Sequence, residues 1–188
     1  MTPVPANTIA VSPAVSPAGS GVRVWATVGS PLGDVLLVGT PSATAPGGTA
    51  LVSLSLPGQK GAATVRDGWR HDPAAFAGIA AQLTAYFEGR LTGFTVEYAD
   101  EGTDFQRRVW RALDAVPYGT TTTYGEIARR IGSSGAAVRA VGTAIGRNPL
   151  LVVRPCHRVI GADGGLRGYA AGLERKEHLL ALEGAPPS

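Results

Sequence analysis

Apolar residues cluster in three short stretches near the start of the chain, at residues 22–28, 33–40 and 49–56. Each is rich in Val, Leu and Thr, has a length typical of a strand, and is bounded by Gly, Pro or Ser. A Ser-Pro-Leu-Gly turn separates the first two stretches, and a Pro- and Gly-containing loop precedes the third. The pattern predicts three β-strands.

A different periodicity follows at residues 72–89, where the spacing of apolar residues changes to that of a helix. Pro73 suits a first helical turn, and Gly89 follows the expected end. The helical stripe consists of Phe76, Ile79, Leu83 and Phe87. Residues 93–100 then read as a further strand. The first half is therefore predicted to be an α/β unit with no obvious chemistry of its own.

The second half is predicted to be mostly helical, with helices at 103–117, 123–132 and 136–147. The first two helices begin with a Thr followed three residues later by Gln or Glu, which is the spacing of a capping box. A Gly-containing turn joins the second and third helices. Two short helices joined in this way are typical of a helix-turn-helix.

The third of these helices contains unusually small side chains. Gly142 and Gly146 each cost the helix about 1 kcal/mol relative to Ala, and Arg139 is the one long side chain among them. Close approach of another backbone explains such glycines, whether that backbone belongs to a packed helix or to DNA.

Composition bounds the class of protein. The 188 residues are 44% hydrophobic, and no apolar run approaches the roughly 20 residues of a membrane span. Residues 1–20 alternate Pro, Ala, Ser and Val; we expect a disordered tail rather than a secretory signal. The expected domains are 21–100 and 101–188. One cysteine fits a reducing cytosol and, with three dispersed histidines, gives no metal-ligand spacing, so we expect no metal.

The charge is distributed unevenly between the two halves. Residues 1–104 carry 5 basic and 8 acidic side chains, whereas residues 105–188 carry 12 basic and 6 acidic ones. Eleven of those twelve bases are Arg, which suits bidentate contacts to phosphate. Such an asymmetry is expected of nucleic-acid binding, although a merely solvated Arg-rich surface gives the same count.

Cys156, the only cysteine, is followed directly by His157 and Arg158. A neighbouring base or cation turns a thiol into a nucleophile by lowering its pKa. From these residues alone a structural cysteine fits as well as a catalytic one. A cysteine hydrolase would also need an acyl substrate and an oxyanion hole, to which nothing in the sequence points.

The segment RPCHRVIGADGGLRGYAAGLERKEHLLALEG, residues 154–184, resembles the active-site region of O6-alkylguanine-DNA alkyltransferases, whose hallmark is a Pro-Cys-His-Arg-Val core. The resemblance extends upstream through FQRRVWRALDAVPYGTTTTYGEIARRIG and VRAVGTAIGRNP, so it covers about residues 100–184. It implies a ribonuclease-H-like α/β N-terminal domain and a mostly helical, winged-helix C-terminal domain. One residue departs from the pattern, because Arg154 stands where the family commonly has an aliphatic side chain.

The resemblance implies DNA repair by irreversible, single-turnover transfer of an alkyl group from O6-alkylguanine to Cys156, with no cofactor. His157 would act as base through a water, with Glu183 orienting its imidazole. Tyr124 would donate its hydroxyl to N3 of the leaving guanine, although an ordinary core or surface tyrosine remains an alternative for it. The logic is that of a nucleophile, a base and an orienting carboxylate.

The partner implied is double-stranded DNA, entered from the minor groove with the damaged nucleotide flipped out. Arg139 would fill the gap in the stack, unless it only contacts phosphate. The helix around it would lie close to the groove through Ala140, Gly142 and Thr143. The substrate pocket would be formed by Val159, Tyr169 and Ala170, with Asn148 as the hinge. The resemblance further implies a cytoplasmic protein that joins the nucleoid on binding and is a monomer in solution, with cooperative assembly on DNA left open.

Two other classes compete with this reading. A non-catalytic binder of alkylated DNA would lack the cysteine, so Cys156 argues against it. A winged-helix transcription regulator would explain the charge asymmetry but gives the Cys-His pair, Tyr124 and Glu183 no role.

Overall fold

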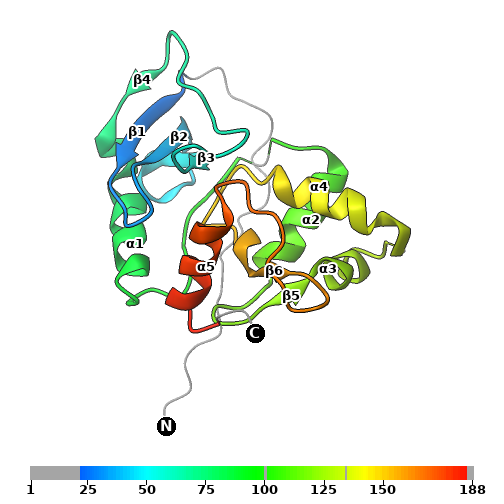
Figure 1. Cartoon of the computed structure of the whole chain (residues 1–188). Helices are drawn as coiled ribbons and strands as arrows, with labels where there is room; N and C mark the ends of the chain where they lie inside the picture. The colour runs from blue at the N-terminus through cyan, green and yellow to red at the C-terminus, as the bar shows by residue number, and fades with distance from the viewer. Residues whose placement is uncertain (1–21, 100, 134, 186–188) are drawn as a thin grey trace.

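The first half of the chain forms a four-stranded sheet with one helix beside it (Figure 1). The computed structural model describes residues 22–99, 101–133 and 135–185, so the predicted tail at 1–20 lies outside the described residues. The strands are β1 (Val24–Val28), β2 (Val35–Pro41), β3 (Thr49–Ser55) and β4 (Arg70–His71). The three strands expected from the sequence are confirmed.

The sheet has the strand order β3-β2-β1-β4, with β1 antiparallel to β2, β2 antiparallel to β3, and β4 parallel to β1. A 3-10 turn, η1 (Pro46–Gly48), leads into β3. The predicted helix begins as a second 3-10 turn, η2 (Pro73–Phe76), and continues as α1 (Ala77–Phe87). Pro73 occupies the first turn as expected, and the side chain of Asp72 caps it by accepting from the Ala75 amide. Helix α1 contributes Ile79, Leu83 and Tyr86 to the core.

The strand predicted at 93–100 does not form over its described part. That segment makes a single parallel bridge, between Tyr98 and Leu51 of β3. Three residues along β3, Leu54 pairs with Leu150 of the second half instead. Two segments of the chain therefore share one edge of β3. This shared edge explains why all seven residues of β3 are buried.

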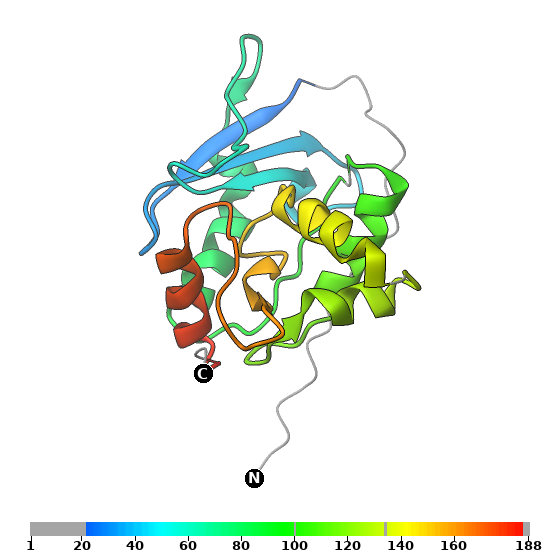
Figure 2. The ribbon, with the colours of Figure 1, turned by 45° about the vertical axis from the view of Figure 1, so that its right-hand side comes forward.

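The helices of the second half are α2 (Asp104–Asp114), α3 (Tyr124–Arg130), α4 (Val138–Gly146) and α5 (Leu173–Leu182). Short elements join them: β5 (Thr122–Thr123), η3 (Gly135–Ala137), η4 (Cys156–Arg158) and β6 (Val159–Ile160). Helices α2, α3 and α4 gather on the side of the molecule away from α1, whereas α5 lies nearer to α1 (Figures 1 and 2). Within the described ranges, no helix is long and apolar enough to cross a membrane.

The two predicted capping boxes have different outcomes. At α2 the box is complete, because the Thr103 hydroxyl accepts from the Gln106 amide and the Gln106 side chain accepts from the Thr103 amide. At α3 only the first half forms, since Thr123 caps the Glu126 amide. The Glu126 carboxylate instead accepts from the hydroxyl of Thr122.

Candidate active site around Cys156

Cys156 begins the 3-10 turn η4 and is almost fully buried, with 4% of its surface exposed. Asn148 holds it in place. Its amide nitrogen Nδ2 lies 3.2 Å from the cysteine Sγ and 3.1 Å from the Arg154 carbonyl oxygen, to which it donates. Its Oδ1 accepts from the Leu150 amide at 3.0 Å. Asn148 therefore fixes both the loop that leads to the cysteine and the sulfur itself.

The loop between Asn148 and Cys156 is tightly turned. Val152 has φ 69°, in the left-handed region that a β-branched residue rarely adopts. The Arg154 amide donates to the Leu150 carbonyl, and the Cys156 amide donates to the Arg154 carbonyl across Pro155. With φ −81° and ψ 56°, Pro155 has the geometry of an inverse γ-turn. The loop is anchored to the sheet, because the Leu54 amide of β3 donates to the Pro149 carbonyl.

The environment of the thiol differs from the one the sequence predicted. Burial raises the pKa of Cys156, while the Asn148 amide and the positive charge of Lys176 oppose that rise. Arg158, adjacent in sequence, directs its guanidinium to Glu183 rather than to the sulfur. The resting thiol therefore keeps its proton at neutral pH, and a base must remove it.

His157 is fully buried, and its Nε2 lies 2.8 Å from Oε1 of Glu183. Burial lowers the pKa of His157, and this effect outweighs the opposing pull of Glu183. The ring is thus neutral at pH 7, with its proton on Nε2 donated to the carboxylate. Nδ1 of His157 has no hydrogen-bond partner among the described residues, so it is the atom that can accept a proton.

Glu183 receives more donors than any surface carboxylate would. Arg158 donates twice, from Nε to Oε2 at 2.7 Å and from Nη2 to Oε1 at 2.9 Å. The Tyr86 hydroxyl donates to Oε1 at 2.5 Å. Burial alone would raise the pKa of Glu183, but the His157 and Arg158 contacts outweigh it and hold the pKa well below its usual range. The carboxylate is therefore ionised and fixed in orientation.

Two tyrosines and a lysine complete the surroundings of the sulfur. Burial, followed by the charge of Cys156, raises the pKa of Tyr124 and of Tyr169, so both remain neutral donors. The Tyr169 hydroxyl is buried without a hydrogen-bond partner in the described part of the chain, whereas Tyr124 donates weakly to the Arg167 carbonyl at 3.4 Å. Unpaired buried hydroxyls are rare in folded proteins. Ala170, next to Tyr169, is half-buried.

Lys176 was missed by sequence reasoning. Its buried ammonium donates to the carbonyls of Val159 and Arg167, both at 2.6 Å, and burial lowers its pKa to about 8. It thereby ties the Val159 carbonyl, a predicted pocket atom, to helix α5. A signal was present: Lys176 precedes Leu179 by three residues and Glu183 by seven, so the helical period places all three on one face. Tyr86 and Asp114 were also missed, and they carried no local signal.

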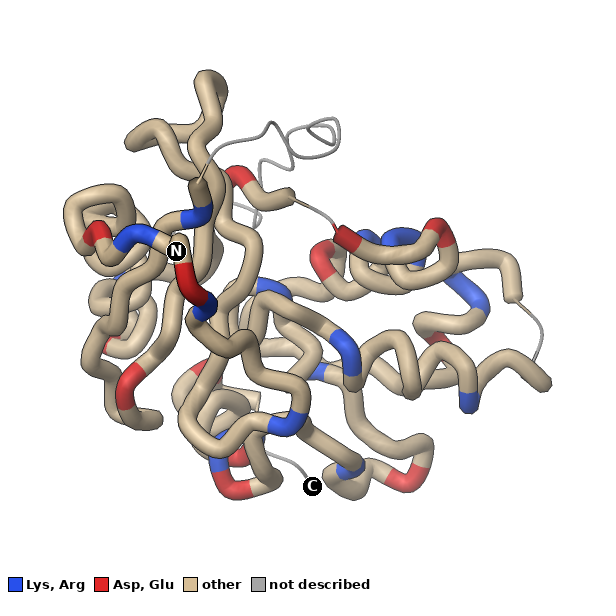
Figure 3. Tube along the Cα trace, turned by 90° about the horizontal axis from the view of Figure 1, so that it is seen from above, with Lys and Arg blue, Asp and Glu red and all other residues tan. Residues whose placement is uncertain are grey.

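The predicted DNA-contacting residues lie on the accessible side of α4. Arg139, Ala140 and Thr143 are exposed and Gly142 is half-buried. An added Cβ at Gly142 would come no closer than 3.7 Å, to the Tyr124 ring, and one at Gly146 would meet nothing within 4 Å. Packing inside the protein therefore does not require these glycines. The exposed arginines of the second half are among the basic positions drawn in Figure 3.

Arg154, the residue that departs from the family pattern, is fully buried. Its Nε donates to Oδ1 of Asp114 at 3.1 Å, and its guanidinium lies between the rings of Tyr98 and Trp110, at 4.9 and 5.1 Å from their centroids. The Tyr98 hydroxyl donates to the other oxygen of Asp114 at 3.0 Å. The charge is thus paired with an acid inside the core, one of the ways a buried charge is tolerated.

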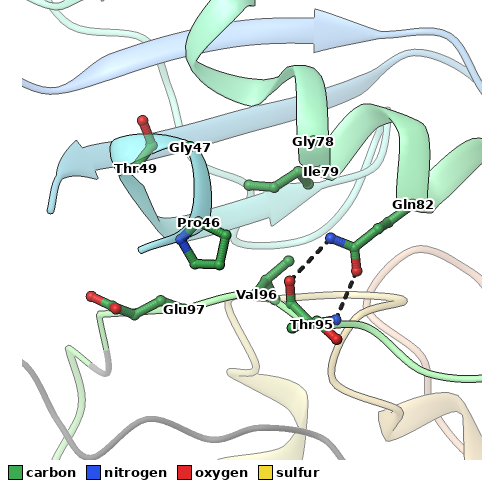
Figure 4. Close-up of a pocket in the computed structure, with 9 residues that line it drawn as sticks. All are labelled: Pro46, Gly47, Thr49, Gly78, Ile79, Gln82, Thr95, Val96 and Glu97. Atoms are coloured by element: carbon green, nitrogen blue, oxygen red, sulfur yellow. Dashed lines mark hydrogen bonds between the residues drawn. The ribbon is translucent and has the colours of Figure 1, made fainter. Parts of the chain in front are cut away.

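Other candidate sites are weaker. A cavity of about 150 Å³ lies in the first half, between α1, η1 and residues 95–97, and holds none of the predicted site residues (Figure 4). Its carboxylate, Glu97, is already engaged by the hydroxyls of Ser42 and Thr44. No cluster of three or more potential metal ligands occurs in the described ranges. His71 and His178 are exposed.

A helical second half that buries a Cys, a His and a Glu close together defines a protein with a candidate site for cysteine chemistry. Comparison with known proteins agrees. Residues 104–185 match the family model described as the DNA-binding domain of 6-O-methylguanine DNA methyltransferase. A methylated-DNA--protein-cysteine methyltransferase of Mycobacterium bovis is 50% identical over 85% of this chain and 91% of its own. The protein of the same name from Methanosarcina acetivorans is 48% identical over 86% of this chain and 98% of its own.

A solved structure, that of Mycobacterium tuberculosis OGT in complex with DNA, superposes with a TM-score of 0.76 at 47% identity, over 87% of this chain and 95% of that one. The chain belongs to the methylated-DNA--protein-cysteine methyltransferase family.

Proposed function

We propose that this protein repairs O6-alkylguanine in DNA by transferring the alkyl group to Sγ of Cys156. The observation that carries the proposal is the buried arrangement of Cys156 beside a His157–Glu183 pair whose imidazole has an unpartnered Nδ1. A bond forms between sulfur and the alkyl carbon as the bond from that carbon to O6 of guanine breaks. Family membership supports the reaction.

His157 is the base in this proposal. The thiol proton passes through a water to Nδ1, and the imidazolium that results is stabilised by ionised Glu183 on Nε2. Asn148 and Lys176 stabilise the thiolate while it forms, because both oppose the rise of its pKa. The thioether product is stable and no step regenerates the thiol, so one molecule repairs one lesion.

The guanine leaves with developing negative charge, which a neutral donor can stabilise. Tyr124 supplies its hydroxyl to N3 in this proposal, and the raised pKa of Tyr124 supports a protonated donor. The Val159 carbonyl accepts from the guanine amino group, and Tyr169 and Ala170 line the pocket. The unpartnered Tyr169 hydroxyl is consistent with a site that receives a polar base.

The DNA enters through α4. Arg139 fills the gap left by the flipped nucleotide, and Ala140, Gly142 and Thr143 lie against the minor groove. Their exposure supports this role, as does the absence of any packing reason for Gly142 among the described residues. Asn148 is the hinge between α4 and the cysteine loop, a role supported by its contacts to both ends of that loop.

The finer description of the fold belongs to the same proposal. Antiparallel β1, β2 and β3 with a parallel β4 support a ribonuclease-H-like plan for residues 21–100. The order α2, β5, α3, α4, β6 supports a winged-helix plan for residues 101–188. We also propose a cytoplasmic monomer that acts on duplex DNA. A non-catalytic binder or a transcription regulator is not favoured, because neither needs Cys156.

The test is a count of transferred groups. The protein is incubated with duplex DNA that carries radiolabelled O6-methylguanine, and the label retained on protein is measured. We expect about one methyl per molecule and no turnover, with none retained by Cys156→Ala. Glu88→Ala, which alters an exposed carboxylate of the first half, is the matched control and should retain the full amount. Continuous turnover, or label on the Cys156→Ala variant, would contradict the proposal.

A further inference from the structure

Tyr86 lies in helix α1 of the first half, yet its hydroxyl reaches into the active site of the second half. It is fully buried and donates to Oε1 of Glu183 at 2.5 Å, across 97 positions of sequence. The same oxygen accepts from Nε2 of His157 at 2.8 Å. Tyr86 and His157 therefore share one acceptor atom.

Aromatic packing fixes the position of that hydroxyl. The Tyr86 ring lies 5.4 Å from the ring of Phe87, 5.1 Å from Phe94 and 6.1 Å from Tyr118, measured between centroids. Contacts of this kind hold a ring without involving its hydroxyl. A phenylalanine at position 86 would keep all three contacts and remove only the hydrogen bond.

We propose that Tyr86 is a positioning residue of the alkyl-transfer reaction, which directs Oε1 of Glu183 toward His157 and limits how strongly that oxygen holds the imidazole proton. The inference rests on the proposed function, since it assigns His157 as the base. It also gives the first half of the chain a part in the chemistry, which the sequence did not indicate.

The hydrogen bonds that Oε1 of Glu183 accepts explain how Tyr86 influences the pKa of His157. Burial and the charge of Glu183 raise the pKa of Tyr86, so its hydroxyl keeps its proton and acts only as a donor. Each donor on Oε1 takes up part of the carboxylate charge. Removing the Tyr86 hydroxyl leaves more of that charge for His157, which stabilises the imidazolium and raises the pKa of His157. A more easily protonated His157 is less often the free base that the reaction needs.

Other groups around this pair are charged or titratable, and all remain in place when position 86 changes. Glu183 and His157 are faced by Arg158, Lys176, Cys156, Tyr118 and Tyr169. Arg158 keeps both of its hydrogen bonds to the carboxylate, so Glu183 stays ionised without Tyr86.

The experiment compares Tyr86→Phe with the wild type in two measurements. The imidazole of His157 is titrated by NMR without DNA, and the rate of methyl transfer is measured against pH. We expect the His157 titration to move upward by about half to one pH unit, the size of one hydrogen bond to a charged group. The acid limb of the rate profile should move by the same amount, so the rate below that limb falls about three- to tenfold.

Tyr118→Phe is the matched control. Its hydroxyl donates to the Leu182 carbonyl at 3.2 Å, next to Glu183 but not onto the carboxylate. This variant should leave both profiles in place. An unchanged His157 titration in Tyr86→Phe, or an equal shift in Tyr118→Phe, would overturn the inference. In a protein that already carries Glu183→Gln, adding Tyr86→Phe should not move the titration of His157 any further. A full shift in that background would also overturn the inference.

Two features keep the test separate from that of the proposed function. The His157 titration needs neither DNA nor transfer, so it is informative even if the wild type transfers nothing. If Tyr86→Phe does not fold, the wild type still offers a measurement, since a hydroxyl whose oxygen lies 2.5 Å from a carboxylate oxygen should give a downfield proton resonance. The absence of that resonance would contradict the inference.

Discussion

Arg154 shows how one residue can leave the family pattern without leaving the fold. A guanidinium in the core is tolerated because Asp114, Tyr98 and Trp110 surround it with a counter-charge and two ring faces. The pair also joins the cysteine loop to α2. Its side chain is therefore part of the support for the loop that carries Cys156, whose sulfur is itself held by the Asn148 amide.

Removing only one partner of the Arg154–Asp114 ion pair should destabilise the folded protein. We expect Arg154→Met alone to lower the free energy of unfolding by about 3–5 kcal/mol, because the Asp114 carboxylate is left buried beside two rings. The double variant Arg154→Met/Asp114→Leu should recover most of that loss, since an apolar pair of similar volume has no charge to desolvate. Urea denaturation of the three proteins measures both effects. A double variant as unstable as the single one would show that the ion pair itself holds the loop.

At the scale of the element, α4 combines small side chains with an exposed surface. Neither of its glycines is forced by a neighbouring atom, and both lower helix propensity. This loss of helix propensity is consistent with a helix surface that another molecule approaches closely. In the proposed function, that approach is made by the minor groove.

The variant Gly142→Ala separates the effect of this glycine on helix stability from its effect on the approach of DNA. We expect the variant to be more stable by up to about 1 kcal/mol, since Ala favours the helix and its Cβ meets only the Tyr124 ring at an ordinary distance. Transfer from duplex DNA should slow because the added methyl blocks close approach. Reaction with free O6-benzylguanine, which needs no groove, should change little. Equal losses with both substrates would mean that Gly142 serves the pocket instead.

Local signals predicted most elements, and contacts distant in sequence account for what they missed. The Thr caps of α2 and α3 and the first three strands depend on neighbours within a few residues, and they were correct, although the capping box of α3 formed only in half. The strand at 93–100 was wrong, because this segment meets β3 only around Tyr98 and the backbone of Thr95 bonds to the side chain of Gln82 instead. In the site, the motif named Cys156, His157 and Glu183, and the structure places the last two in contact. Nothing in the sequence pairs Arg154 with Asp114, or Tyr86 with Glu183.

At the scale of the whole molecule, charge is sorted between core and surface. Of the basic half, Arg154, Arg158 and Lys176 are buried, together with Asp114 and Glu183. Nine basic and four acidic side chains of residues 105–188 remain at least partly exposed. The excess of positive charge is therefore a property of the surface, where it can meet phosphate.

Duplex affinity should depend steeply on salt. Four exposed arginines lie on α3 or α4 or at the end of α4: Arg129, Arg130, Arg139 and Arg147. If the three arginines other than Arg139 each contact a phosphate, affinity falls roughly fortyfold between 50 and 200 mM salt. Fluorescence anisotropy with labelled duplex measures the slope, and Arg90→Ala, an exposed arginine of the other half, should not alter it. A flat salt dependence would rule out this surface as the DNA contact.

The shared edge of β3 has a consequence for how the protein is made. During synthesis, β3 leaves the ribosome roughly a hundred residues before Leu150 does, and until then half of its edge lacks its final partner. An open edge is where nascent chains pair with one another. The sheet is thus completed only when the segment that carries the nucleophile arrives, so the last stage of folding is also the one that assembles the reactive loop.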